Sequence, residues 1–391
     1  MELSLKEAAI LYEAECGKDG GAWNCQVFWK NRRIGNLWIT EGALYRMSQE
    51  KSRTCMLGKQ SIELKNPVFI RESASVVGTK EGQGPLAELF DMIGQDDMFG
   101  CASWEEAESS LQKDAVYLAL GKAGLKKEDI RYLFAGDLLG QSIASSFGLA
   151  SYEIPLVGLY GACSTCGLSL SMGAMTVNAG YGEHVVCVTS SHFASAEKEF
   201  RFPLGYGNQR PLSASWTVTG SGAFVLSSTQ GKKSRGKITG LTTGKIMDYG
   251  LKDSMNMGAC MAPAASDLIY RHLKDFGRTP SDYDKIITGD LGSVGQHALI
   301  DLLNEKDVDI AGQHMDCGIE IYDAKEQDTH AGGSGCGCSA VTLSAYILKK
   351  IEEGVWKRVL FVPTGALLSK TSFNEGQTVP GIAHGVVIEA V

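Results

Sequence analysis

Residues 158–182 read GLYGACSTCGLSLSMGAMTVNAGYG, and this stretch contains no charged side chain. A membrane span needs about 20 mainly apolar residues, but here Gly, Ser, Thr and Asn interrupt every aliphatic run. A helix whose sides are all small or apolar is typical of a helix buried inside a protein. The stretch therefore predicts a helix buried between two β-sheets and starting near Cys163.

A second stretch, THAGGSGCGCSAVTLSAYIL (residues 329–348), repeats this composition. Each stretch follows a strand that ends in Gly-Asp-Leu, YLFAGDLLGQ (132–141) or KIITGDLGSVGQ (285–296), and precedes a β-rich run. Strands that alternate with helices predict mostly parallel sheets. Because each half contributes one buried helix, we expect a five-layer αβαβα fold with two pseudo-symmetric halves, 56–230 and 231–391.

Residues 1–55 lie outside the repeat. They contain three of the six tryptophans and three of the eleven cysteines, without a periodicity that would bury them. We interpret them as a small N-terminal extension of unknown role, or as upstream sequence from an early start. No signal peptide is recognisable, so the cysteines are expected to be reduced. The net charge of −8 argues against nucleic acid as a partner.

Cys163 has the chemistry of a nucleophile at the start of a helix. Helix N-termini expose unpaired N–H groups and a positive dipole end, which lower the pKa of a thiol. The alternative is a buried structural cysteine. A redox pair of Cys163 and Cys166 lacks its usual aromatic neighbours, and a zinc site with Cys336 and Cys338 lacks loop-borne ligand pairs. We therefore expect no metal and a packing role for the remaining cysteines of both stretches.

An acyl-transfer enzyme also needs a general base near its nucleophile. We expect the base in the loop after the second Gly-Asp-Leu, but that loop carries Asp290 and its first histidine is His297, seven residues later. His192 and His384 are predicted at strand ends, where each is either a pocket residue or a structural histidine.

The doubled pattern resembles the thiolase superfamily, including β-ketoacyl carrier-protein synthase III. From about Met56 to Val391 it resembles the stage V sporulation protein AD family more closely. The motifs that carry this resemblance include AGDLL, YGACST, AEKEFRFP, YGNQRP, MGACMAPAA, HMDCGIEIY and AGGSGCGCSA.

The resemblance implies a soluble component of the spore channel complex that binds dipicolinic acid, with or without calcium, and moves it into the developing spore. It implies peripheral association with the cytoplasmic side of the spore inner membrane, contact with other channel membrane proteins, and a homodimer that pairs along a sheet edge near residues 184–191. No cofactor and no membrane-spanning helix are expected.

The resemblance also bears on catalysis. Thiolase-like enzymes place a histidine in the second Gly-Asp-Leu loop and an Asn or His in the second glycine loop. This chain has Asp290 and Gly333 there. We therefore expect a non-enzyme in which Cys163 is a vestigial nucleophile; the alternative is a condensing enzyme of the ketoacyl synthase III type.

Dipicolinate is a flat aromatic dianion, and this chemistry suggests its contacts. The backbone at Cys163 and Ser164 would hold one carboxylate at a helix start, Arg201 or Arg210 would hold the other, and Tyr206 would cover the ring. Asp137 and Asp290 would meet calcium or cap local backbone. The remaining expected pocket residues are His192, Gly333 and Ser334.

Overall fold

The computed structural model describes residues 13–19, 22–29, 32–40, 56–200, 209–231 and 233–391. The chain divides into two compact units, Met1–Cys55 and Met56–Val391. The first contains an antiparallel three-stranded sheet of β1 (Glu13–Asp19), β2 (Ala22–Trp29) and β3 (Arg32–Thr40). Our sequence analysis derived no element for this extension.

The first half of the second unit builds a five-stranded mixed sheet. In chain order its strands are β5 (Ser61–Val77), β7 (Tyr132–Gly136), β8 (Leu156–Gly158), β9 (His184–Ser191) and β11 (Gly220–Ser227). In space they follow the order β8-β7-β9-β11-β5, and β11 alone is antiparallel to its neighbours.

The second half repeats this topology. Its strands are β12 (Gly236–Thr243), β13 (Lys285–Thr288), β14 (His314–Asp316), β16 (Arg358–Val362) and β18 (Gly381–Glu389), in the order β14-β13-β16-β18-β12. Counted within each half, both orders are 3-2-4-5-1, and the fifth strand is the antiparallel one in both. The long β5 joins the two sheets, since Ser61–Ile70 pairs with β12 and Phe69–Val77 pairs with β11.

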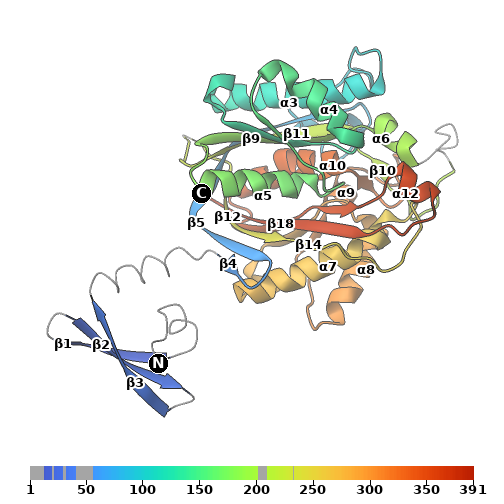
Figure 1. The fold of residues 1–391 in the computed structure, drawn as a ribbon. Coiled ribbons are helices and arrows are strands. Elements are labelled where there is room, and N and C mark those ends of the chain that lie inside the picture. Colours follow the sequence, from blue (N-terminus) through green and yellow to red (C-terminus); the bar gives the residue numbers. More distant parts are fainter. Residues whose placement is uncertain (1–12, 20–21, 30–31, 41–55, 201–208, 232) are drawn as a thin grey trace. The chain divides into compact units, whose positions relative to one another are not determined.

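Helices form three layers around the two sheets (Figure 1). The outer layers are α3 (Trp104–Ala123) with α4 (Ile143–Leu149), and α7 (Met257–Phe276) with α8 (Gly292–Asn304). The middle layer holds α5 (Thr165–Asn178) and α10 (Cys336–Thr342), which continues through a π-helical turn (Leu343–Ile347) into α11 (Leu348–Glu352). The five-layer αβαβα fold predicted from the sequence is confirmed.

Equivalent outer helices also begin and end alike. The Ser103 side chain accepts a hydrogen bond from the Glu106 N–H at the start of α3, and the Asn256 side chain accepts one from the Ala259 N–H at the start of α7. Each helix ends at a glycine with positive φ, Gly124 or Gly277, where any other residue would be strained.

Two glycines set the register of the middle helices. A Cβ at Gly167 on α5 would lie 2.6 Å from a backbone oxygen of β18, and one at Gly337 on α10 would lie 2.5 Å from a backbone oxygen of β11. Each helix therefore packs closely on the fifth strand of the opposite half. Gly167 thus corresponds to Gly337, Cys166 to Cys336, and Cys163 to Gly333, so only the first half has a cysteine at the nucleophile position.

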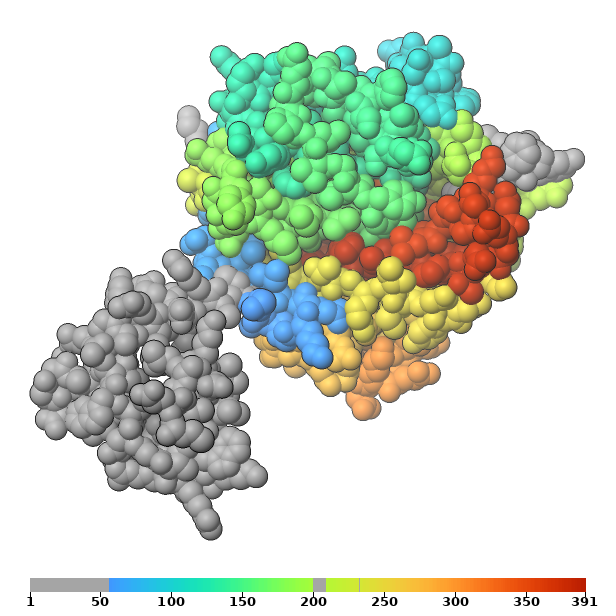
Figure 2. Space-filling model, viewed as in Figure 1, coloured from blue at the N-terminus to red at the C-terminus, as the bar shows by residue number. Residues whose placement is uncertain are grey.

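The sheet edges differ from our expectation for a dimer. β9, at residues 184–191, pairs with β7 on one side and β11 on the other, and so is no edge. The sheet instead ends at β8 and β14. On the molecular surface shown in Figure 2, residues of the first half lie directly against residues of the second half. Within the described ranges, no helix is long and apolar enough to cross a membrane.

Candidate functional site

Cys163 sits in a tight loop between β8 and α5. The loop is held by two hydrogen bonds, from the Gly161 N–H to Thr165 Oγ1 (3.0 Å) and from the Ser164 hydroxyl to the Gly161 carbonyl (2.6 Å). Ala162 adopts a φ of 50°, an uncommon and strained conformation for a residue with a Cβ. This hydrogen-bonded turn places Cys163, which is 6% exposed, just before the start of the helix.

The second half covers this loop from the other side. A Cβ at Gly365, on β17 (Thr364–Ala366), would lie 2.4 Å from the Gly161 carbonyl oxygen and 3.2 Å from the Cys163 nitrogen. A glycine is therefore required at 365 for the two halves to meet here. Cys163 belongs to the contact between the halves, as Ser164 does, which is fully buried.

Asp290 stands opposite Cys163 and is held by three donors. Its Oδ2 accepts hydrogen bonds from the Gly335 N–H (2.9 Å) and the Ser334 hydroxyl (3.1 Å), and its Oδ1 accepts one from the Thr364 hydroxyl (2.8 Å). Ser334 and Gly333 form the short strand β15, which pairs with β10 (Trp216–Thr217). The structure thus brings together Cys163, Ser164, Asp290, Gly333 and Ser334 of the predicted site.

Of the two interpretations of Cys163, the electrostatics favour a buried structural cysteine over an activated thiol. Burial, first, and the nearby Asp290 carboxylate, second, raise the pKa of the Cys163 thiol well above its ordinary value. Burial also raises the pKa of Asp290, to about 6, so this carboxyl group is mostly ionised at neutral pH. The favourable helix dipole is outweighed because a thiolate here would be desolvated and would face a negative charge.

Asp137, the counterpart of Asp290 in the first half, serves its own loop. Its Oδ1 accepts a hydrogen bond from the Leu139 N–H (2.9 Å), and its Oδ2 accepts bonds from the N–H (2.9 Å) and hydroxyl (2.6 Å) of Ser145. Burial raises its pKa. Asp137 therefore caps local backbone, which was one of the two roles considered from the sequence.

His192 and Trp216 line a second cavity, of about 260 Å³, and Arg210 packs on the Trp216 ring. His192 Nε2 is 2.8 Å from the Asp97 carbonyl, and burial lowers the His192 pKa. Arg210 Nη2 donates to Asp328 Oδ2 (3.0 Å), and its guanidinium carbon is 4.8 Å from the Trp216 ring centroid. Arg201 and Tyr206 lie outside the described residues.

The other two candidate bases differ in position. His297 is on the exposed side of α8, with Nδ1 2.6 Å from the Ser293 carbonyl. His384 is buried on β18, and its Nε2 is 3.7 Å from the position a Cβ would take on Gly161. Burial lowers the pKa of His384 to about 4, so it is neutral at physiological pH. Of these two histidines, His384 is thus the one that lies beside the Cys163 loop.

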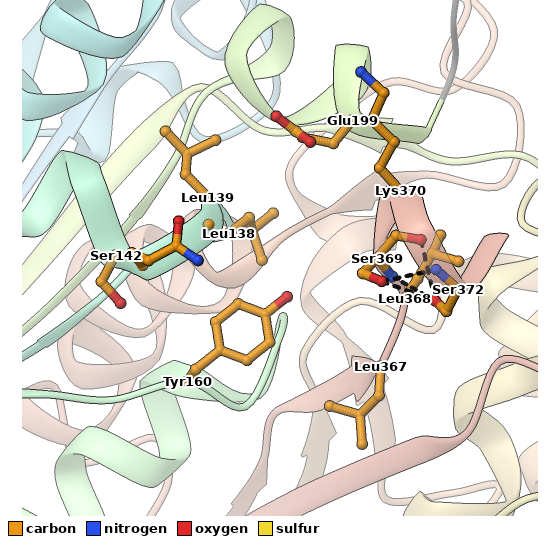
Figure 3. A pocket seen from close by; sticks show the side chains of 12 residues that line it. Leu138, Leu139, Ser142, Tyr160, Glu199, Leu367, Leu368, Ser369, Lys370 and Ser372 are labelled. Atoms are coloured by element: carbon orange, nitrogen blue, oxygen red, sulfur yellow. Dashed lines mark hydrogen bonds between the residues drawn. The ribbon is translucent and has the colours of Figure 1, made fainter. Parts of the chain in front are cut away.

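A cavity of about 460 Å³ opens beside the Cys163 loop (Figure 3). Its lining comes from the first Gly-Asp-Leu loop, the residue three before Cys163, the end of α6 (Phe193–Phe200), and the segment leading into α12 (Lys370–Asn374). The lining residues are Leu138, Leu139, Gly140, Gln141, Ser142, Tyr160, Glu199, Leu367, Leu368, Ser369, Lys370 and Ser372.

None of these lining residues was predicted from the sequence, although several belong to the motifs described above or lie next to them. Leu138 belongs to the first Gly-Asp-Leu, and Tyr160 opens the YGACST motif. Their proximity to Leu367 and Lys370 depends on contact between the halves, which sequence spacing does not show.

Nothing in the described part of the chain forms a metal site. No group of three or more His, Cys, Asp or Glu side chains in those ranges is arranged to hold an ion. The cysteines between Met56 and Val391, including Cys163, Cys166, Cys336 and Cys338, are free thiols, and these four are buried.

The fold and the cysteine loop define a protein of the thiolase-like class. The structure is similar to 3-oxoacyl-[acyl-carrier-protein] synthase III from Aquifex aeolicus VF5, at 15% identity and a TM-score of 0.50 over 82% of this chain and 99% of that one. It is also similar to human mitochondrial 3-ketoacyl-CoA thiolase in complex with CoA, at 13% identity and a TM-score of 0.52 over 84% of this chain and 99% of that one. At these identities the similarity concerns the fold alone.

Sequence comparison gives the particular family. Residues 58–389 match the family model of Stage V sporulation protein AD. The chain is 44% identical over 334 residues to Stage V sporulation protein AD of Bacillus subtilis (strain 168), which covers 85% of this chain and 98% of that protein. This chain therefore belongs to the Stage V sporulation protein AD family, a family of sporulation proteins.

Proposed function

We propose that this protein is a non-catalytic sporulation subunit that binds dipicolinate and passes it to the membrane proteins of a spore channel. In this proposal it acts as a homodimer at the cytoplasmic side of the spore inner membrane. The ligand is a flat dianion, taken up with or without calcium, in the cavity beside the Cys163 loop.

The observation that carries the non-catalytic part is the pairing of Cys163 with Asp290. Nucleophilic catalysis needs a thiolate, or a base that removes the thiol proton. Asp290 disfavours the thiolate by its charge, and its own oxygens already accept three hydrogen bonds. The glycine loop adds only backbone at Gly333, where an enzyme of this class would need a second polar side chain.

Two features of the cavity lining support an anionic ligand. Lys370 is a cation in this lining and the Ser142 hydroxyl is a further donor, whereas the Ser369 and Ser372 hydroxyls already donate within their own turn. Arg201 and Arg210 remain the proposed arginine contacts, although Arg210 does not line this cavity and is occupied with Asp328.

The rival function is a condensing enzyme with Cys163 as nucleophile, and one observation favours it. The strained Ala162 positions Cys163 at the helix start as an enzyme would. In that case His384, which reaches the Cys163 loop, is the candidate base.

Calorimetric titration of the purified protein with dipicolinate, with and without calcium, tests the proposal. We expect saturable binding, and no covalent acyl group on Cys163 after incubation with acyl-CoA or acyl carrier protein. If an arginine holds a carboxylate, Arg201→Ala or Arg210→Ala should weaken binding by about one to two decades, the effect of losing a charge-assisted hydrogen bond of roughly 1.5–3 kcal/mol.

Cys163→Ala distinguishes the two functions. A binding protein should keep most of its affinity for dipicolinate, whereas a condensing enzyme should lose nearly all of its activity. Carbon–carbon condensation that disappears with Cys163→Ala, together with no dipicolinate binding, would overturn the proposal.

A further inference from the structure

Tyr160 lies where the cavity and the Cys163 loop meet. It is the residue that leads into the Gly161–Ser164 turn, and it lines the cavity, whereas Cys163 does not. Figure 3 shows the Tyr160 ring standing in the cavity, with Leu138 and Leu139 on one side and Leu367 and Leu368 on the other. The ring therefore belongs to the wall of the cavity next to the Cys163 loop.

The two ends of the Tyr160 side chain meet different surroundings. The residue is 49% exposed and its ring faces the cavity. Its hydroxyl group lies close enough to the buried interior that burial, followed by the charges of Cys163 and Cys336, raises its pKa to about 12. Among the described residues, no hydrogen bond to this hydroxyl is present. The cavity lining thus contains a neutral phenol whose hydroxyl can donate to a ligand.

The residues around Cys163 are also tightly packed. Cys163 is 6% exposed, and Gly365 presses against the backbone of its loop from the second half. The neighbouring Leu139 is 3% exposed and fixed through the bond from its N–H to Asp137. Of the side chains around this passage, Tyr160 is the large and partly exposed one.

We propose that Tyr160 is the floor of the ligand cavity: its ring stacks against a flat aromatic acid, its hydroxyl donates to a carboxylate of that acid, and its bulk keeps the acid away from the Cys163 thiol. This inference rests on the proposed function for the identity of the ligand, but the barrier to Cys163 does not depend on any ligand. The leucine pairs suit a flat ring, which aliphatic side chains can contact on both faces.

Thiol labelling tests the barrier. The protein is treated with N-ethylmaleimide, and the label on each cysteine is followed over time by mass spectrometry. Partly exposed Cys101 serves as a reactive reference and buried Cys166 as an unreactive one. Cys163 should label slowly in the unmodified protein and at least about tenfold faster in Tyr160→Ala, because access limits the reaction. Tyr160→Phe, which keeps the ring, should label slowly.

The Asp290 carboxylate also slows this reaction, so the comparison is repeated with Asp290→Asn. Asp290→Asn alone should leave Cys163 shielded, and Asp290→Asn with Tyr160→Ala should give the fastest labelling. Tyr181→Ala, at a tyrosine that is 73% exposed and outside the cavity lining, is the matched control and should change nothing. Rapid labelling of the unmodified protein, or equal rates with and without Tyr160 in both backgrounds, would overturn the barrier.

Dipicolinate titration tests the ligand contact separately. Tyr160→Phe should weaken binding by several-fold through loss of one donor, and Tyr160→Ala by more. If dipicolinate binds and neither variant changes its affinity, the contact is wrong while the proposed function stands. If dipicolinate does not bind at all, the proposed function fails, and the labelling result still decides the barrier.

Discussion

The two halves of the core share a topology but use their matching aspartates in opposite ways. Asp137 accepts hydrogen bonds only from its own loop, at Leu139 and Ser145. Asp290 accepts bonds from the second glycine loop and from Thr364, and faces Cys163 of the other half. One copy of the repeat thus braces a turn, while the other forms part of a site. The comparison teaches that a repeated motif fixes where a side chain lies, whereas its neighbours fix what it does.

In both halves the middle helix packs closely on the opposite half. Disrupting this packing should have the largest effect on the stability of the protein. We expect Gly167→Ala and Gly337→Ala each to lower the free energy of unfolding by roughly 1–3 kcal/mol, since a Cβ at either position overlaps backbone that must shift. Chemical denaturation measures this. Gly121→Ala, where a Cβ meets nothing within 4 Å, is the control and should not destabilise the protein. A large difference between the first two variants would break the equivalence of α5 and α10.

A buried carboxyl group in the first half and a buried histidine in the second half should change the free energy of unfolding in opposite directions as the pH changes. Burial raises the pKa of Glu81 in the first half to about 7, and it lowers the pKa of His272 in the second half to about 3. An acid with a raised pKa contributes stability that is present at low pH and lost as the pH rises through the folded pKa. A histidine with a lowered pKa contributes stability that is lost as the pH falls below about 6.5, where the unfolded chain takes up the proton.

We therefore expect Glu81 to lower the free energy of unfolding as the pH rises from about 4.5 to about 7, and His272 to lower it as the pH falls from about 6.5 to about 3. Each effect should amount to roughly 1–3 kcal/mol. Urea unfolding between pH 3 and pH 8 measures both effects. Because the two pH windows overlap and act in opposite directions, the variants separate them: Glu81→Gln should remove the fall in stability towards neutral pH alone, and His272→Gln the fall towards acid pH alone. A variant that removed both would show that the two effects do not belong to separate halves.

The unequal roles of the two aspartates should appear in the chemistry of Cys163. Asp290→Asn removes the negative charge that disfavours the thiolate, so in the Tyr160→Ala background the labelling rate of Cys163 should rise several-fold and the rise should begin at lower pH. Asp137→Asn in the same background is the matched control and should leave the rate unchanged. Equal effects of the two substitutions would mean that both aspartates act on Cys163.

The edges of the two sheets offer a smaller contrast. Around β8, Phe147 is 73% exposed and Leu156 is 41% exposed, so we now expect the homodimer to form there and not at β9. Sedimentation should show a dimer that Phe147→Asp converts to a monomer, with a thermal midpoint within a few degrees of the parent protein. A protein that sediments as a monomer at micromolar concentration would contradict the dimer.

Removing residues 1–55 should have the smallest effect. These residues form a separate compact unit, so a chain starting at Met56 should keep its thermal midpoint and its affinity for dipicolinate. A large fall in either quantity would show that the extension stabilises the core or takes part in binding.

The amino-acid sequence by itself determined the layers and their order. The charge-free stretches at 158–182 and 329–348 predicted the two central helices, since chain of that composition is stable only between apolar layers. The recurrence of Gly-Asp-Leu predicted two equivalent halves. The residue-by-residue match between the two stretches came only from the structure, in which Gly167 and Gly337 pack on the opposite halves.

Tertiary structure decided the chemistry. The helix start predicted an acidic thiol at Cys163, but the pKa depends on burial and on Asp290, which lies 127 positions further along the chain. The cavity escaped prediction for the same reason, since Tyr160 and Leu367 become neighbours only when the halves meet. Local sequence fixes what each segment can form, because hydrogen bonding and side-chain size act within a few residues. Distances between segments fix the charge and the solvent around each group, and these depend on the whole fold.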